Sequence, residues 1–115
     1  MTLSIEQAVQ GFAAAGSEPR LEVLLALVRA GPDGLMVNEI QERLEMPAST
    51  LAHHLRFLAA GGLIEQEKNG RAVHNRAAFE TIEALADFLL RECCADMDGP
   101  ANPKERHTNM SGTAR

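Results

Sequence analysis

The chain has 115 residues, a formal net charge of -5, and 45% apolar residues. This length accommodates one domain with a modest core and argues against a second domain. No stretch approaches the ~20 apolar residues of a membrane span, and the N-terminus lacks a basic segment followed by an unbroken apolar run. We therefore expect a cytoplasmic protein with no membrane partner.

Residues 1–15 have the pattern of an amphipathic helix. Ser4 followed three residues later by Gln7 fits a capping box, in which each residue satisfies a backbone N–H of the other. The apolar side chains then recur at helical spacing and form one stripe, which consists of Ile5, Ala8, Val9 and Phe12.

A second helix is predicted from Ser17 to Ala30. Ser17 offers a hydroxyl cap, Glu18 places an acid in the first turn, and Pro19 occupies a position where the missing N–H costs little. The sequence GPDG at residues 31–34 ends the helix. The predicted buried stripe consists of Leu21, Leu24, Leu25 and Val28.

Residues 37–58 read as two short amphipathic helices joined by a tight turn, which predicts a helix-turn-helix. The turn at Glu45 lacks the glycine that a left-handed backbone favours, so either some strain or a different turn type is expected there. Pro47 is predicted at the first position of the second helix. The two apolar faces consist of Val37, Ile40 and Leu44, and of Leu51, Leu55 and Leu58.

The outer face of the second of these helices indicates DNA recognition. Free N–H groups in its first turn, around Ser49 and Thr50, can face a phosphate. The neighbouring His54 is predicted to be a boundary residue. Short or cationic hydrogen-bonding side chains on the outer face can enter a major groove, and they are Ser49, Ala52, His53 and Arg56.

The segment after this helix predicts a β-hairpin. Asn69-Gly70 is a strong signal for a two-residue turn, with strands at residues 63–68 and 71–76. A ribbon directly after a recognition helix is a wing, and Lys68, Arg71 and Arg76 would lie along the phosphate backbone. These cations also form a local basic face in an otherwise acidic chain, which makes a nucleic-acid partner compatible with the net charge.

A last helix is predicted over residues 79–95, with a narrow stripe of Ile82, Leu85, Leu89 and Cys93. The first and last helices carry apolar faces beyond the needs of the internal helices, so we predict a homodimer through both. Residues 97–115 lack apolar periodicity and are predicted to be a disordered tail after a single domain at residues 1–96. The predicted interface residues are Ile5, Val9, Phe12, Ile82, Leu85 and Leu89.

The segments GSEPRLEVLLAL, VNEIQERL and PASTLAHHLRFLAAGGLI, together with the NGR turn, resemble the ArsR/SmtB family of winged-helix, metal- or stress-responsive repressors. The resemblance covers residues 3–95. It implies a mainly α fold of five helices with a two-stranded antiparallel wing, and a homodimer that leaves DNA when an inducer binds. It also implies operator contacts by Ala48, Ser49, Ala52, His53 and Arg56.

Two sensor sites of the family are absent from this sequence. The cysteines that some arsenic repressors carry at the third helix are replaced by LMVN at residues 35–38, and the last helix has no His for a zinc site. What remains is RECC at residues 91–94, which resembles the ending of an arsenic-responsive subgroup. Arsenite prefers three thiolates, as a soft ion does, and only Cys93 and Cys94 are present.

Three interpretations of the cysteine pair stay open. The pair could bind As(III) or another thiophilic ion if the helix frays at its end, because adjacent helical residues point about 100° apart. The thiols could instead oxidise and distort the dimer contact. In the third interpretation Cys93 is a small apolar residue of the dimer stripe and Cys94 is incidental.

The sequence thus predicts a DNA-binding repressor and no enzyme, since it has no nucleophile–base signature, glycine-rich phosphate loop or metal-binding spacing. One alternative is a redox-responsive repressor that uses the same cysteines. Another is a winged-helix protein-interaction module that does not bind DNA. Binding to operator DNA that is selective for sequence and sensitive to salt would separate the repressor from the module.

Overall fold

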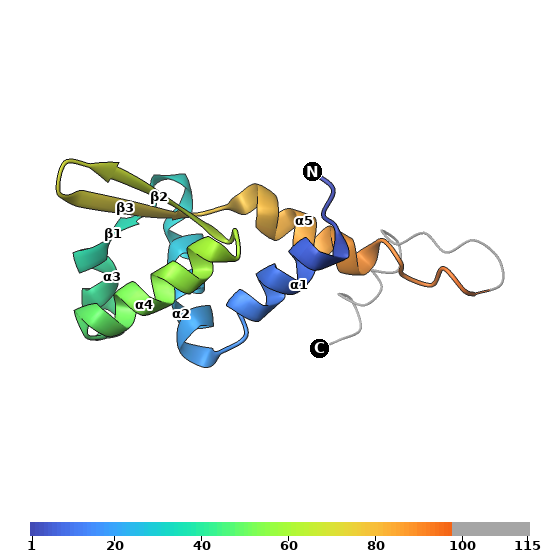
Figure 1. The fold of residues 1–115 in the computed structure, drawn as a ribbon, viewed down its shortest axis with the longest axis horizontal. Coiled ribbons are helices and arrows are strands. Elements are labelled where there is room, and N and C mark those ends of the chain that lie inside the picture. The colour runs from blue at the N-terminus through green and yellow to red at the C-terminus, as the bar shows by residue number, and fades with distance from the viewer. Residues whose placement is uncertain (98–115) are drawn as a thin grey trace.

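The computed structural model describes residues 1–97, which form five α-helices and a small sheet. In chain order the elements are α1 (Ile5–Ala14), α2 (Glu18–Ala30), the 3-10 turn η1 (Gly31–Asp33), β1 (Leu35–Met36), α3 (Val37–Leu44), α4 (Ala48–Ala60), β2 (Ile64–Asn69), β3 (Ala72–Ala77) and α5 (Phe79–Leu90). The helix-turn-helix and wing lie at one end, and α1 and α5 lie at the other (Figure 1). This is the predicted winged helix-turn-helix. The predicted tail lies, from residue 98, outside the described residues.

The predicted starts of the first two helices are confirmed. Ser4 and Gln7 form the reciprocal capping box of α1, and the Ser17 hydroxyl accepts a hydrogen bond from the Arg20 N–H. The predicted buried stripe of α2 is partly wrong, because Leu21 and Leu25 are 42% and 37% exposed. α2 is packed on α3, α4 and β3 at once, so its buried face is broad and rotated toward Val23, Leu24, Ala26 and Leu27.

The turn between α3 and α4 has the strain that its sequence predicts. Glu45 adopts φ 52° and ψ 46°, the left-handed region in which a side chain is unfavourable. Pro47 is the residue that precedes α4 and is not its first helical residue as predicted. Its ψ of 148° is extended, and its carbonyl accepts the first helical hydrogen bond, from Leu51 N–H at 2.9 Å.

The sheet has three antiparallel strands in the order β1-β3-β2, one more than predicted. The two-residue strand β1 is too short to give a periodic signal and exists because Leu35 pairs with Asn75. The hairpin turn is shifted by one residue from the prediction. Asn69 pairs with Ala72, which leaves Gly70 and Arg71 as the loop. Gly70 has φ 64°, as a type II′ turn needs at its first central position.

Asn75 fixes the wing to the helical core. Its side chain is fully buried, its Oδ1 accepts from Gln66 Nε2 at 2.8 Å, and its Nδ2 donates to the Leu35 carbonyl at 3.5 Å. A buried amide without partners would cost about 1–3 kcal/mol. Because these partners come from β1 and β2, Asn75 holds all three strands in one register.

Gly34 makes room for β3 to pass. A Cβ at Gly34 would meet the backbone oxygen of Asn75, and its φ of 68° disfavours a side chain as well. Gly31 is a matched control, since its φ is 80° but nothing lies near its missing Cβ. We expect Gly34→Ala to lower the free energy of unfolding in urea by about 2 kcal/mol more than Gly31→Ala. Equal losses would mean that backbone strain alone makes glycine necessary at Gly34.

α1 joins the two ends of the molecule. A Cβ on Gly11 would lie 2.9 Å from a methyl of Leu85 on α5, and one on Gly61 would collide with the Ala14 Cβ. Glycine therefore permits α1 to approach both α5 and the end of α4. No helix within residues 1–97 has the length and apolar character needed to cross a membrane.

The last helix is shorter than predicted, since α5 ends at Leu90 and not at Ala95. Beyond it Cys93 N–H bonds to Leu90 O and Ala95 N–H to Glu92 O, which are turn bonds rather than α-helical bonds. Cys94 has φ 61°, which a right-handed helix cannot contain. The cysteine pair therefore lies in a turn after α5.

Candidate functional site

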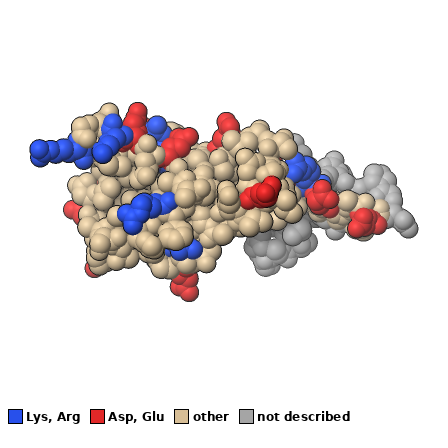
Figure 2. All heavy atoms as spheres, in the orientation of Figure 1, with Lys and Arg blue, Asp and Glu red and all other residues tan. Residues whose placement is uncertain are grey.

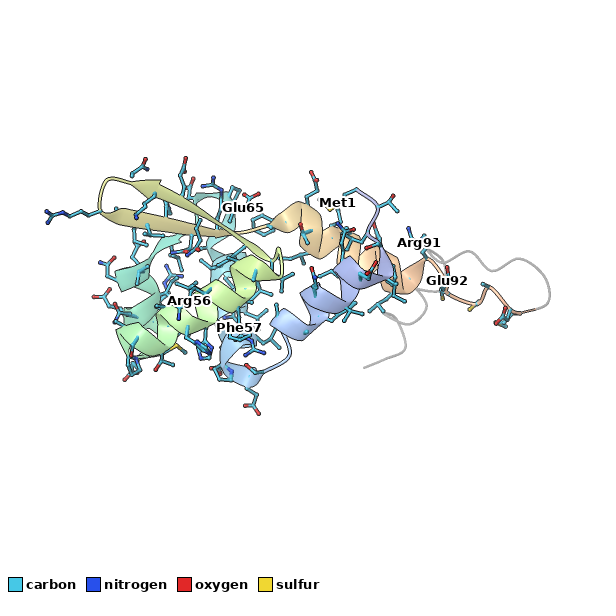
Figure 3. All side chains as sticks on the ribbon, in the orientation of Figure 1. Met1, Arg56, Phe57, Glu65, Arg91 and Glu92 are labelled. Atoms are coloured by element: carbon cyan, nitrogen blue, oxygen red, sulfur yellow. The ribbon has the colours of Figure 1, made fainter. Side chains whose placement is uncertain are left out.

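The outer face of α4 is open to solvent, as predicted. Leu51, Leu55 and Leu58 are buried in the core, which turns the opposite face of the helix outward. Figure 3 shows Arg56 on this outer face. The exposed residues there are Ser49, Ala52, His53 and Arg56.

The start of α4 offers backbone donors to an anion. Pro47 gives no side-chain cap, and no acidic residue lies in the first turn. Ala48, Ser49 and Thr50 are all exposed, and they belong to the turn whose N–H groups have no helical acceptor. Such a helix end attracts a phosphate.

The three predicted cations of the wing have different environments. Lys68 and Arg71 are exposed beside and within the hairpin turn. Arg76 is instead placed between two acids, with Nε 3.4 Å from Glu65 Oε1 and Nη1 3.4 Å from Glu67 Oε1. The charge of Arg76 on β3 is balanced by these two acids of β2, so Lys68 and Arg71 at the tip are the wing cations that form no ion pair within residues 1–97. Figure 2 shows Lys and Arg atoms mainly over the wing and α4.

Phe57 belongs to this surface, although the sequence patterns did not single it out. It is 46% exposed on α4, and its ring centroid lies 4.9 Å from that of His53. The signal available in the sequence was the four-residue spacing of His53 and Phe57, which places two rings on one helical face.

His54 lies at the edge of the core, as predicted. Its Nδ1 is buried and has no hydrogen-bond partner. Burial lowers the pKa of His54 below the ordinary value of 6.5, and the nearby His53 and Arg20 lower it further. Neutral imidazole is therefore favoured at this position. Within residues 1–97 no group of three or more His, Cys, Asp or Glu side chains could hold a metal ion.

The turn after α5 brings the two thiols together. Cys93 Sγ and Cys94 Sγ are 3.6 Å apart, and both side chains are half-buried. On a continuous helix the two side chains would diverge. The left-handed backbone at Cys94 is what lets both sulfurs face one position.

The residues predicted for a dimer interface divide into three groups by exposure. Leu85 is 7% exposed and packs against Gly11 within the subunit, so it serves the subunit's own core. Ile82 is half-buried. The others form exposed apolar surface on α1 and α5, with Ile5 at 69%, Val9 at 60%, Phe12 at 41% and Leu89 at 62%.

The amino-acid sequence is similar to those of transcriptional regulators. A family model described as a helix-turn-helix domain matches residues 16–67. The chain is 32% identical over 98 residues to the uncharacterized HTH-type transcriptional regulator YbzH of Bacillus subtilis, covering 73% of this chain and 96% of YbzH. It is 31% identical over 88 residues to the transcriptional activator HlyU of Vibrio cholerae, covering 76% of this chain and 79% of HlyU.

Solved structures extend the match to the whole fold. An ArsR-like transcriptional regulator from Rhodococcus sp. RHA1 has a TM-score of 0.67 at 26% identity, covering 95% of this chain and 94% of that one. The homodimeric winged helix-turn-helix DNA-binding domain Mb0332 from Mycobacterium bovis, a possible ArsR-family regulator, has a TM-score of 0.61 at 26% identity, with coverage of 80% and 81%.

Proposed function

Because this chain belongs to the ArsR family of winged helix-turn-helix transcriptional regulators, we propose that it is a homodimeric repressor that reads an operator with α4. One observation carries the proposal. The uncapped start of α4 and its exposed polar face lie on the same molecule as a wing whose tip cations, Lys68 and Arg71, form no ion pair with an acid of residues 1–97. In this proposal α4 contacts base edges and the wing contacts phosphates.

Two copies of the chain are needed to read two half-sites. The exposed apolar residues of α1 and α5 provide a surface for the second copy, at the end of the molecule away from the wing (Figure 1). In a twofold dimer this leaves both α4 helices at a fixed separation, which must match one turn of the double helix. The Mycobacterium bovis domain is homodimeric, which supports the same assembly here.

We assign the inducer site to Cys93 and Cys94. Their 3.6 Å Sγ–Sγ distance suits two bonds to one soft ion, and the turn supplies the frayed end that such a site requires. The chain has only two cysteines, so one subunit cannot supply arsenite with three thiolates. A monosubstituted trivalent organoarsenical has two exchangeable positions and fits two thiolates better. Binding next to α5 would disturb the dimer contact and lower operator affinity.

Redox sensing is a second candidate because of the same distance. A disulfide needs an S–S length near ~2.05 Å, and the two sulfurs are already in contact. A peroxide would accept two electrons from the two thiolates and leave a disulfide with water. The resulting strain in the turn would act on the same end of α5.

The first test is binding to the promoter region of the protein's own gene. A repressor should retard this duplex at low salt, lose affinity steeply with salt, and bind a scrambled duplex of equal length more weakly. A protein-interaction module should retard neither duplex. Titration of the complex with methylarsenite, arsenite, cadmium and peroxide then identifies the inducer, and a promoter reporter distinguishes repression from the activation named for HlyU.

Arg71 and His53 should affect DNA binding differently. We expect Arg71→Ala to weaken promoter and scrambled duplexes alike and to reduce the slope of log affinity against log salt by about 1. His53→Ala should weaken the promoter selectively. Fluorescence anisotropy at several salt concentrations measures both.

Arg91→Ala is the matched charge control, because Arg91 lies at the end of the molecule opposite the wing (Figure 3). It should leave binding to both duplexes unchanged. If Arg71→Ala changes only the promoter affinity and His53→Ala weakens both duplexes, the assigned roles of wing and helix are reversed.

A further inference from the structure

Arg20 is held at both of its ends. Its backbone N–H is bonded to the Ser17 hydroxyl at 3.3 Å. Its side chain donates from Nε to the Ala14 carbonyl at 2.7 Å and from Nη2 to the Ala13 carbonyl at 3.2 Å. These carbonyls end α1, where a cation is favourable for the helix dipole. The guanidinium therefore has a fixed plane and a fixed place relative to α1.

Phe57 of α4 stacks on this guanidinium. The Arg20 Cζ lies 4.8 Å from the centre of the Phe57 ring, which is cation–π distance. The ring is 46% exposed, so the buried core surrounds only part of it. Its contacts with Arg20 and His53 restrict the exposed part.

His53 is the next member of this row. Its ring meets the Phe57 ring edge-on, with centroids 4.9 Å apart and planes at 67°. Such edge contacts are a preferred geometry for aromatic pairs. On its other side the His54 ring centroid lies 5.9 Å away. The rotamer of the exposed His53 side chain is therefore restricted by Phe57, which is restricted in turn by Arg20.

We propose that Arg20 and Phe57 are positioning residues for sequence recognition: they hold the His53 imidazole toward the DNA and tie its position to the end of α1. The inference rests on the proposed role of α4 as the reading helix. It adds that selectivity depends on two side chains that need not touch DNA, one of them on α2. Since α1 also carries the exposed apolar stripe, the row Arg20–Phe57–His53 joins the proposed dimer helix to the reading surface.

The test compares two duplexes, one selected by the full-length wild-type protein from a randomised pool and a scrambled version of it. We expect Phe57→Leu, which keeps apolar bulk and removes the ring, to lower the affinity ratio for the two duplexes by ~10-fold, the order of one lost base contact. Phe57→Tyr, which keeps the ring, should preserve the ratio. Arg20→Lys keeps the charge but cannot donate the paired guanidinium hydrogen bonds to the Ala13 and Ala14 carbonyls. It should lower the affinity ratio, as Phe57→Leu does.

A double-mutant cycle separates positioning from direct contact. In a His53→Ala background Phe57→Leu should have no further effect on the ratio. Phe79→Leu is the matched control, since Phe79 is 40% exposed at the start of α5 and outside the row. Phe79→Leu should leave the affinity ratio unchanged. The thermal unfolding midpoint of Phe57→Leu should equal that of the wild type.

Several outcomes would overturn the inference. It fails if Phe57→Leu keeps wild-type selectivity, or if the loss is as large in the His53→Ala background, which would mean that Phe57 contacts DNA itself. A loss accompanied by an equal drop in scrambled-duplex affinity and in thermal stability would indicate a structural role only. If the wild-type protein selects no sequence from the pool, the proposed function itself is wrong, which is a different result from these.

Discussion

A Val9→Glu variant is expected to be a monomer in solution and to bind a two-half-site operator at least ~100-fold more weakly than the wild type. Val9 is 60% exposed in the middle of the α1 stripe, between Ile5 and Phe12. In a twofold interface the variant would bury two unpaired carboxylates, which is strongly unfavourable. The monomer then loses the gain in affinity that comes from joining two reading helices.

The fold should survive this substitution, because Val9 faces solvent in the subunit and glutamate is a good helix former. Circular dichroism checks the fold, sedimentation checks the assembly, and anisotropy checks the affinity. Gln10→Glu is the control, since it adds the same charge to an exposed position next to the stripe. A Val9→Glu protein that stays dimeric would move the interface away from α1.

Replacing both Cys93 and Cys94 by serine should abolish release from the operator by methylarsenite while leaving operator affinity within about twofold of the wild type. The hydroxyl oxygen of serine is a hard, protonated donor that does not replace a thiolate on a soft ion. The pair lies after α5, at the end of the molecule away from the wing, so DNA contacts should not change (Figure 1). Anisotropy of the complex during titration measures the release.

The single variants and an adjacent control sharpen this result. Cys93→Ser and Cys94→Ser should each lose most of the response, because the two sulfurs are 3.6 Å apart and each would supply one of the two bonds to arsenic. Ala95→Ser adds a hydroxyl to the same turn and should respond as the wild type does. Release by peroxide but not by methylarsenite in the wild type would support the redox alternative. Full release of the double variant would show that the sensor lies elsewhere.

Local patterns were sufficient for most of the helical framework. The capping box of Ser4 and Gln7 marks the start of α1 because its partners lie three residues apart. The same holds for the strained turn at Glu45 and for the outward face of α4, since a helix that buries Leu51, Leu55 and Leu58 must expose the opposite side. The predicted DNA-binding role of that face depends on this local geometry and on the family resemblance.

Other features came from contacts between residues far apart in the chain. β1 exists only because β3 runs beside it, and Asn75 is buried by partners on two strands. The charge of Arg76 is balanced by acids on the neighbouring strand, which makes Arg71 the more accessible cation. Leu85 belongs to the core because Gly11 of α1 lets it approach.

The sequence by itself determined which segments are helical, which face of the recognition helix turns outward, and that two cysteines stand next to each other. Those properties depend on periodicity, capping and composition over a few residues. Only the tertiary structure decided that Arg20 of α2 contacts both the end of α1 and the Phe57 ring of α4, and that Leu85 of α5 packs against Gly11 of α1. Such contacts depend on how whole elements pack, and the spacing of residues along one element does not specify that packing.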